Sequence, residues 1–132
     1  MVMLIAEDDP LISMTLETFF TKEGYKVIST NNGREAMLKI EEHLPDIILT
    51  DVMMPFYSGL EIIAKIKSGF NKKIIVVVLS AMGQESAVKE AFELGADDYV
   101  TKPFSLAELS LRVKRLVKVR GRNTVLQLDE KF

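Results

Sequence analysis

The sequence has no cysteine, a single histidine and no long apolar run, and each of these absences excludes a class of protein. Without cysteine, disulfides and thiolate metal sites are excluded, and a cytoplasmic protein is expected. The histidine, His43, lies near a predicted helix end before Pro45, so we expect it to be solvated or capping and to bind no metal. No stretch approaches the roughly 20 apolar residues that span a bilayer, and the apolar residues 1–6 are followed at once by acids, unlike a signal peptide.

An excess of positive charge is lacking as well. Lys and Arg number 17 against 19 Asp and Glu, which gives a net charge of −2. Because phosphate contacts need a basic surface, this charge argues against direct binding of nucleic acid. The 132 residues, 48% hydrophobic and 27% charged, have instead the composition of one soluble globular domain.

Apolar residues follow the spacing of strands and helices in turn. Short apolar runs predict five strands, and apolar residues at helical spacing between and after them predict five helices. The strands are expected at 2–6, 26–30, 47–51, 74–79 and 98–101, and the helices near 10–23, 36–44, 60–69, 84–94 and 105–119. This alternation over short links predicts an α/β fold, a flavodoxin-like doubly wound sheet of five parallel strands with five helices in three α/β/α layers.

The pattern changes at about Arg120. Residues 120–123 are typical of a linker, and Thr124 to Leu128 alternate weakly, like the first strand of a further domain. We therefore expect residues 1–119 to form one domain. Residues 120–132 are expected to be a linker or the start of an output domain, in the front part of a longer protein.

Polar residues follow four of the predicted strands at the point where each strand ends. Glu7 and Asp8 follow the first strand, Asp51 closes the third, Ser80 follows the fourth and Lys102 the last. The carboxyl ends of parallel strands meet at one edge of a sheet, and ligands bind in the crevice there. We therefore expect these five residues to lie together.

Such a cluster favours a metal ion and a phosphoryl group. Glu7, Asp8 and Asp51 would repel and raise one another's pKa values unless a cation held them ionised. A hard ion with few protein oxygens and several waters is Mg²⁺ rather than Ca²⁺. Lys102 adds a fixed positive charge and Ser80 a hydroxyl, a set suited to phosphoryl transfer, which needs charge neutralisation and positioning.

Each of these residues alone has a simpler explanation. Asp9, before Pro10, has the form of a helix N-cap, and a lone acid at a strand end is usually a cap or a solvated residue. Ser80 alone is more often a cap, and Lys102 alone is more often a surface residue. Compatible chemistry from independent strands at one edge is what favours a functional site.

From about residue 2 to residue 119, the sequence resembles the receiver domain of two-component response regulators. The resemblance rests on the acidic pair after the first strand, Asp51 followed by Val52-Met53-Met54-Pro55, Ser80-Ala81, and the run from Gly95 to Phe104. Any one motif is weak, and the set in this order is strong. The segment 95–119 most resembles the receivers that precede winged-helix DNA-binding domains.

The resemblance implies a signalling switch and not an enzyme that acts on other molecules. Asp51 would be the phosphoacceptor, taking the phosphoryl group from a histidine kinase or a small acyl phosphate. Glu7, Asp8 and Asp51 would hold Mg²⁺ together with the backbone carbonyl of Met53.

The resemblance also implies how the signal leaves the site. Lys102, before a cis Pro103 peptide, would pair with Asp51 and then with the phosphoryl oxygens. Ser80 would move to hydrogen-bond a phosphoryl oxygen and Tyr99 would turn inward, as a population shift of the face formed by the fourth helix, last strand and fifth helix. That face would pair in a homodimer, with DNA bound only through the output domain.

The fourth helix departs from the pattern of receivers that pair in this way. Val88 stands where that class has a basic residue, and Lys89 follows it, about 100° further round the helix, so the dimer mode stays open. Cross-dimer ion pairs would come from Asp97, Asp98, Glu108, Arg112 and Arg115.

The loop after Asp51 departs from the family pattern too. Where the family often has Gly, this chain has Phe56, followed by Tyr57, so the loop is expected to be bulkier and less mobile. Met53 and Met82 take the positions that flank the phosphoryl group in such domains, and neither side chain can orient water. We therefore predict a long-lived phosphoaspartate.

Two other functions stay open on the residues. A Mg²⁺-dependent phosphatase with an aspartyl nucleophile would use the same Asp51 and Lys102, but it needs a second Asp two residues on, where this chain has Met53. Topoisomerase-primase-like metal sites fail for the same reason. The other alternative is a receiver-like interaction module that takes no phosphate.

Overall fold

Five parallel strands form one sheet in the computed structural model, which describes residues 1–69 and 73–130, from residue 122 onward as backbone only. The strands are β1 Val2–Ala6, β2 Lys26–Thr30, β3 Ile47–Asp51, β4 Ile75–Ser80 and β5 Asp98–Thr101. The helices are α1 Pro10–Lys22, α2 Gly33–His43, α3 Gly59–Gly69, α4 Glu85–Leu94 and α5 Leu106–Glu130. The strand order β2-β1-β3-β4-β5 is the flavodoxin-like doubly wound order, as predicted.

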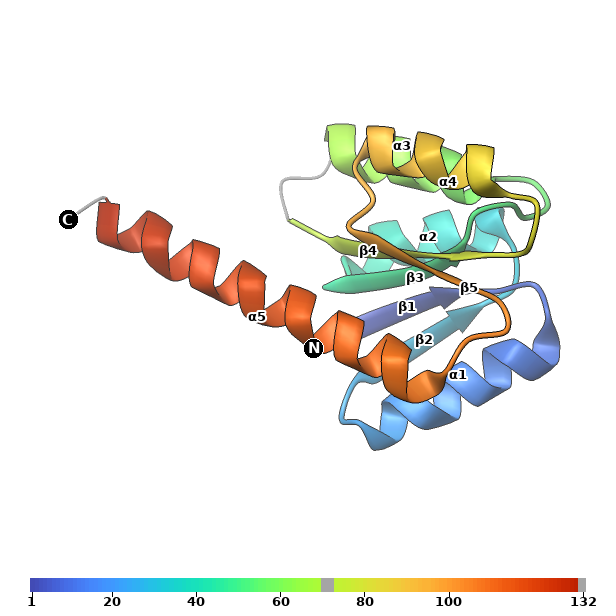
Figure 1. Ribbon diagram of the computed structural model, residues 1–132, viewed down its shortest axis with the longest axis horizontal. Coiled ribbons are helices and arrows are strands. Elements are labelled where there is room, and N and C mark those ends of the chain that lie inside the picture. Colours follow the sequence, from blue (N-terminus) through green and yellow to red (C-terminus); the bar gives the residue numbers. More distant parts are fainter. Residues whose placement is uncertain (70–72, 131–132) are drawn as a thin grey trace.

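The sheet is the middle of three layers. Helices α2, α3 and α4 cover one face, and α1 and α5 cover the other (Figure 1). Each face has its own apolar cluster, in which Ile48 and Val76 pack under the first group of helices and Leu49 and Val77 under the second. Because β3 and β4 have helices on both sides, they are buried along their whole length.

Local signals are visible at the start of α1 and at the end of α2. The side chain of Asp9 accepts hydrogen bonds from the amides of Leu11 and Ile12, with Pro10 in the first turn, so the predicted N-cap is confirmed. His43 closes α2 and is half-buried, 3.6 Å from the Glu42 carboxylate. Because Asp9 caps α1, neither Glu7 nor Asp8 serves as its N-cap.

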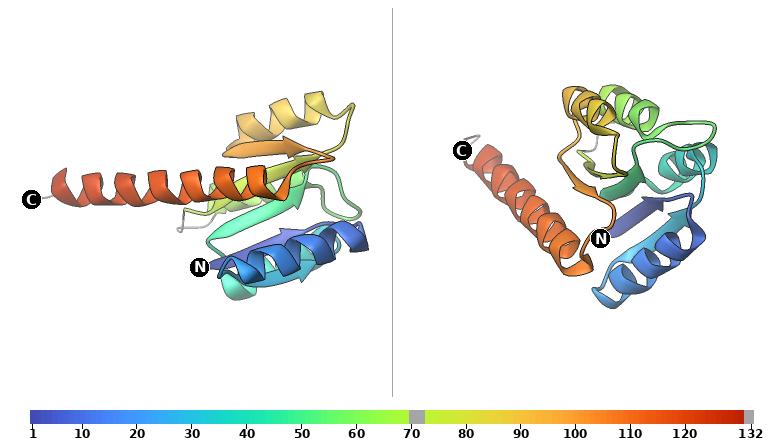
Figure 2. Two further views of the ribbon diagram at one scale, coloured as in Figure 1. Left: turned by 60° about the horizontal axis from the view of Figure 1, so that its bottom comes forward. Right: turned by 45° about the vertical axis from the view of Figure 1, so that its right-hand side comes forward.

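The course of α5 corrects one expectation. Residues 124–128, expected to alternate like a strand, are helical instead, as are residues 120–123, since the helix continues to Glu130 and projects beyond the sheet (Figures 1 and 2). One Gly costs a helix only about 1 kcal/mol, and this stretch has no Pro to end it. Arg120 also holds the helix to the sheet, donating to the Lys73 carbonyl at 3.0 Å and lying 3.6 Å from the Asp46 carboxylate. A domain boundary near residue 119 stays a prediction.

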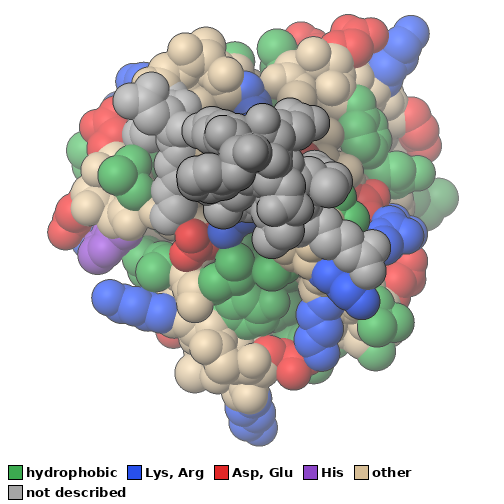
Figure 3. All heavy atoms as spheres, turned by 90° about the vertical axis from the view of Figure 1, so that its left-hand side faces the viewer, with side chains coloured by type: hydrophobic (Ala, Val, Ile, Leu, Met, Phe, Trp, Pro, Cys, Tyr) green, Lys and Arg blue, Asp and Glu red, His purple; other side chains and the backbone are tan. Residues whose placement is uncertain are grey.

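The end of the molecule where the strands begin and α5 leaves carries mixed charge. Acidic, basic and hydrophobic side chains alternate around the described part of this end (Figure 3), in keeping with the net charge of −2. Among the helices that the structure describes, none has both the length and the apolar character to cross a membrane.

Candidate functional site

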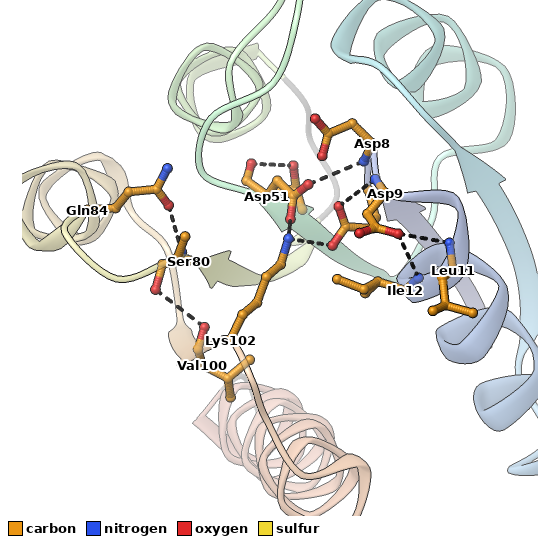
Figure 4. Close-up of polar contacts among 12 residues, drawn as sticks. Asp8, Asp9, Leu11, Ile12, Asp51, Ser80, Gln84, Val100 and Lys102 are labelled. Atoms are coloured by element: carbon orange, nitrogen blue, oxygen red, sulfur yellow. Dashed lines mark hydrogen bonds and ion pairs between the residues drawn. The ribbon is translucent and has the colours of Figure 1, made fainter.

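Three carboxylates meet beyond the ends of two neighbouring strands. Strands β1 and β3 pair in parallel with Ala6 opposite Thr50, so the next residues, Glu7 and Asp51, come side by side. Glu7 is fully buried, Asp51 is nearly so, and Asp8 is exposed. Carboxylate oxygens of Glu7, Asp8 and Asp51 lie within 4.8 Å of one another, so the predicted convergence is observed (Figure 4).

Lys102 reaches the same point from the far side of the sheet. Its Nζ lies 2.5 Å from Oε1 of Glu7 and 2.8 Å from Oδ1 of Asp51 (Figure 4). Because β4 separates β5 from β3, the side chain crosses the end of β4 to make these contacts. The Lys102-Pro103 peptide is cis, as the family resemblance implies. One ammonium therefore faces three carboxylates.

Burial and crowding change the acidity of these groups. Burial, with the neighbouring Glu7 carboxyl, raises the pKa of Asp51 to about 8, against the opposing effect of the contact with Lys102. Partial burial also disfavours ionised Asp8, but its hydrogen bonds with Asp51 and Glu7 outweigh this and lower its pKa. Burial disfavours charged Lys102, yet the Asp51 and Glu7 carboxylates outweigh it and raise its pKa. The three carboxylates of the site therefore outnumber its one cationic group, Lys102.

The donor set fits a hard divalent cation. Within the part of the chain that the structure describes, Oε1 of Glu7 and Oδ1 of Asp51 are buried atoms without a well-aligned hydrogen-bond donor. Both atoms contact the Lys102 ammonium, and a carboxylate oxygen that makes one such contact keeps a second lone pair for a metal. Exposed Asp8 gives a hydrated ion access to the cluster. Three carboxylate oxygens with room for water suit Mg²⁺.

Ser80 lies at this edge but is turned away from the carboxylates. It ends β4, is buried, and donates through Oγ to the Val100 carbonyl at 3.4 Å, a long and weak hydrogen bond (Figure 4). The next amide, of Ala81, donates to Oε1 of Gln84 at 2.8 Å. The sequence pattern does not mark Gln84 as part of the site. The one available signal is its position three residues after Ala81, at the start of α4, where its side chain can accept from the Ala81 amide.

Tyr99 lies on the outside of the sheet edge. Its ring is 41% exposed and meets Phe92 of α4 edge-on, with the ring centroids 5.7 Å apart. Between α4 and β5 is a groove of about 590 Å³ that runs from Ser80 to Tyr99 and is also lined by Lys89. The two predicted switch residues therefore border one groove.

Four of the five expected interface charges pair with one another within this chain. Arg112 contacts both carboxylate oxygens of Asp98 at 3.0 Å and the Glu108 carboxylate at 3.0 Å, and Arg115 lies 3.8 Å from Asp98. The fifth, Asp97, turns toward α3. There it accepts from the Val76 amide at 2.8 Å and lies 3.4 Å from the Lys67 ammonium.

Comparison with known proteins gives consistent matches. Residues 3–114 match the family model described as the response regulator receiver domain. Response regulator RR06 of Streptococcus pneumoniae is 40% identical over 118 residues, which are 89% of this chain and 54% of that protein. The phosphate regulon transcriptional regulatory protein PhoB of Rhizobium meliloti is 35% identical over 86% of this chain and 51% of its own length.

Solved structures agree with these relatives. A putative response regulator from Chloroflexus aurantiacus superimposes with a TM-score of 0.82 at 34% identity, covering 89% of this chain and 97% of that one. The chain spans about half the length of the curated relatives it matches.

Proposed function

This chain belongs to the response regulator receiver domain family, and from that premise we propose that it is a phosphorylation-controlled switch with Asp51 as its phosphoacceptor. The observation that carries the proposal is the meeting of Asp51 with Glu7, Asp8 and Lys102 at the ends of β1 and β3. The family is one of signalling switches. We infer that this member likewise catalyses only its own phosphorylation and slow dephosphorylation.

Asp51 acts as the nucleophile. One of its carboxylate oxygens attacks the phosphorus of a histidine kinase's phosphohistidine, forming a P–O bond while the P–N bond breaks. The electron pair of the broken bond goes to the ring nitrogen, and because the other ring nitrogen carries a proton, the imidazole leaves as the kinase's neutral histidine. Attack needs the ionised carboxylate, so a group whose pKa is raised to about 8 must first lose its proton.

The surrounding residues neutralise charge. Bound at Glu7, Asp8, Asp51 and the Met53 carbonyl, Mg²⁺ would supply the positive charge that keeps carboxylates and phosphoryl oxygens together. Lys102 already lies 2.8 Å from the Asp51 carboxylate and is placed to follow the negative charge onto the phosphoryl group. Met53 and Met82, both exposed, present no group that orients water, which supports the predicted long-lived phosphoaspartate.

The switch begins at Ser80. The hydrogen bond from Ser80 to Val100 is weak, so replacing it by a hydrogen bond to a phosphoryl oxygen costs little free energy. Movement of Ser80 opens the groove that it shares with Tyr99, and Tyr99 turns into it, giving up the edge-on contact with Phe92. The face of α4, β5 and α5 then has a different shape and binds a partner.

We propose that the partner is a second copy and that the output is transcription. The name of PhoB describes a regulator of transcription, and this chain matches about half of that protein, so DNA binding belongs to a part outside this domain. The homodimer is supported by the presence of both signs of charge on this face, since Arg112, Asp98 and Glu108, which pair within the chain, can exchange partners with an identical face. A cytoplasmic location stays a prediction.

The test is the mass of the intact protein after treatment with acetyl phosphate and Mg²⁺, with light scattering on the same samples. The wild type is expected to gain one phosphoryl group and to dimerise, and Asp51→Asn is expected to do neither. A gain without dimerisation would refute the homodimer and keep the switch. No gain by the wild type would overturn the proposal in favour of a phosphate-independent interaction module.

A further inference from the structure

The loop between β3 and α3 contains a backbone conformation that its sequence disfavours. Phe56 has φ 72°, in the left-handed region that a bulky side chain rarely adopts. Its ring is 69% exposed, so burial in the core does not explain it. A strained residue of this kind persists only where its surroundings hold it.

The surroundings that hold Phe56 belong to the first turn of α2. The guanidinium carbon of Arg34 lies 4.8 Å from the centre of the Phe56 ring, within cation–π distance. The amide of Gly33 donates to the Pro55 carbonyl at 3.3 Å. A Cβ on Gly33 would lie 2.0 Å from the Tyr57 carbonyl oxygen, so only glycine permits this contact. The tip of the loop is therefore fastened to α2.

One stem of the loop is fastened to the sheet, and the other stem is fastened to the first. At one stem the Val52 amide donates to the Leu79 carbonyl at 3.0 Å, and at the other the Gly59 amide donates to the Val52 carbonyl at 3.0 Å. A Cβ on Gly59 would lie 2.2 Å from the Asp51 carbonyl oxygen. Met53 lies between these fixed points, directly after the phosphoacceptor strand.

We propose that Arg34 and Phe56 form a strap that orders the loop of the Mg²⁺ site before the metal binds. The inference rests on the proposed function, in which the Met53 carbonyl is a ligand. Both residues act as positioning residues, since neither is a ligand. A loop that is already ordered loses less conformational freedom when the ion binds, so the strap raises the affinity for Mg²⁺.

Phe56→Gly separates this role from a structural one. Glycine adopts the left-handed conformation without strain, so the variant is expected to fold at least as stably as the wild type. It also removes the ring that Arg34 holds, which frees the tip of the loop. Loss of a supporting contact around a metal site is expected to raise the Kd for Mg²⁺ by about tenfold, at unchanged or higher Tm. If the residue only stabilised the fold, a higher Kd for Mg²⁺ would come together with a lower Tm.

The experiment compares Mg²⁺ binding by calorimetry in Arg34→Ala, Phe56→Gly and the double variant. The double variant is expected to lose no more affinity than either single one, because one contact is removed in each. Phe56→Trp keeps an aromatic face and is expected to bind as the wild type does, whereas Phe56→Leu keeps the bulk and is expected to bind weakly. Lys39→Ala is the matched control, with the same charge change on the same helix.

Amide hydrogen exchange in metal-free protein gives an independent readout. Faster exchange at Gly33 in Arg34→Ala and Phe56→Gly, with Lys39→Ala as the wild type, supports the strap. The strap would be overturned if amide exchange and Mg²⁺ affinity were unchanged in both variants. It would also be overturned if Phe56→Leu bound Mg²⁺ as tightly as Phe56→Trp. A wild type that neither binds Mg²⁺ nor takes phosphate refutes the proposed function instead, and the exchange rates still test the strap.

Discussion

Replacing Asp51 by Asn is expected to stabilise the metal-free protein, although it removes the proposed phosphoacceptor. The burial that raises the pKa of Asp51 to about 8, from an ordinary 3.8, means that the folded state holds this proton more tightly than the unfolded chain. The unfolded chain therefore binds fewer protons between these two values. As the pH rises through this window, the free energy of unfolding of the wild type falls, and above about 8 the loss is complete.

The size of the effect follows from the width of the window. Each pH unit within this window lowers the free energy of unfolding of the wild type by at most about 1.4 kcal/mol. Since pH 7 lies about three units above the ordinary pKa, the loss at pH 7 has an upper limit of about 4 kcal/mol. In Asp51→Asn, Lys102 loses one of its two carboxylate partners, which offsets part of the gain. A net stabilisation of about 1–3 kcal/mol at pH 7.5 is expected, shrinking toward zero near pH 4.

Urea denaturation in EDTA at several pH values between 4.5 and 8 measures this difference. Asp9→Asn is the matched control, because it makes the same chemical change at the residue next to Asp8 and Asn caps a helix as well as Asp does. It is expected to follow the wild type at every pH. If the difference in free energy of unfolding between the wild type and Asp51→Asn is the same at every pH, Asp51 does not carry the proton and the reasoning fails. Added Mg²⁺ is expected to stabilise the wild type more at pH 8 than at pH 6, since the ion competes with that proton.

Three further substitutions test the neighbouring contacts. Lys102→Ala leaves the Glu7 and Asp51 carboxylates without their cation, and urea denaturation without Mg²⁺ should show a loss of about 2–4 kcal/mol that saturating Mg²⁺ partly restores. Gln84→Ala releases the amide after Ser80 for a phosphoryl oxygen, so mass spectrometry should show faster phosphorylation, with stability changed by no more than about 1 kcal/mol. Arg112→Ala removes the partner of Asp98 and Glu108, and light scattering should show weaker dimerisation at an unchanged extent of phosphorylation; equal dimerisation would exclude this face.

Much of the site could be predicted because it depends on topology. In a parallel sheet, residues that follow strand ends meet at one edge whatever the side chains in between, so Glu7, Asp8, Asp51 and Lys102 needed only a correct strand pattern. The strand pattern in turn depends on local periodicity, which the apolar runs carry clearly.

The directions and partners of individual side chains could not be predicted from the sequence. Asp97 and Asp98 are neighbours of one type, yet Asp97 turns to Lys67 and Asp98 to Arg112, because successive residues of a strand face opposite ways. Gln84 owes its role to the loop that Ala81 begins. These partners come from elements that no local pattern relates.

The sequence by itself determined the fold, the carboxylate cluster and the place of Asp51 within it, since periodicity and strand ends are properties of short segments. Only the tertiary structure decided that Ser80 contacts Val100, that α5 continues past Arg120 and that Arg34 holds Phe56 in a left-handed conformation. Each of these depends on a contact between segments brought together by folding. The physical reason is that local propensities differ by about 1 kcal/mol, so one tertiary contact is enough to override them.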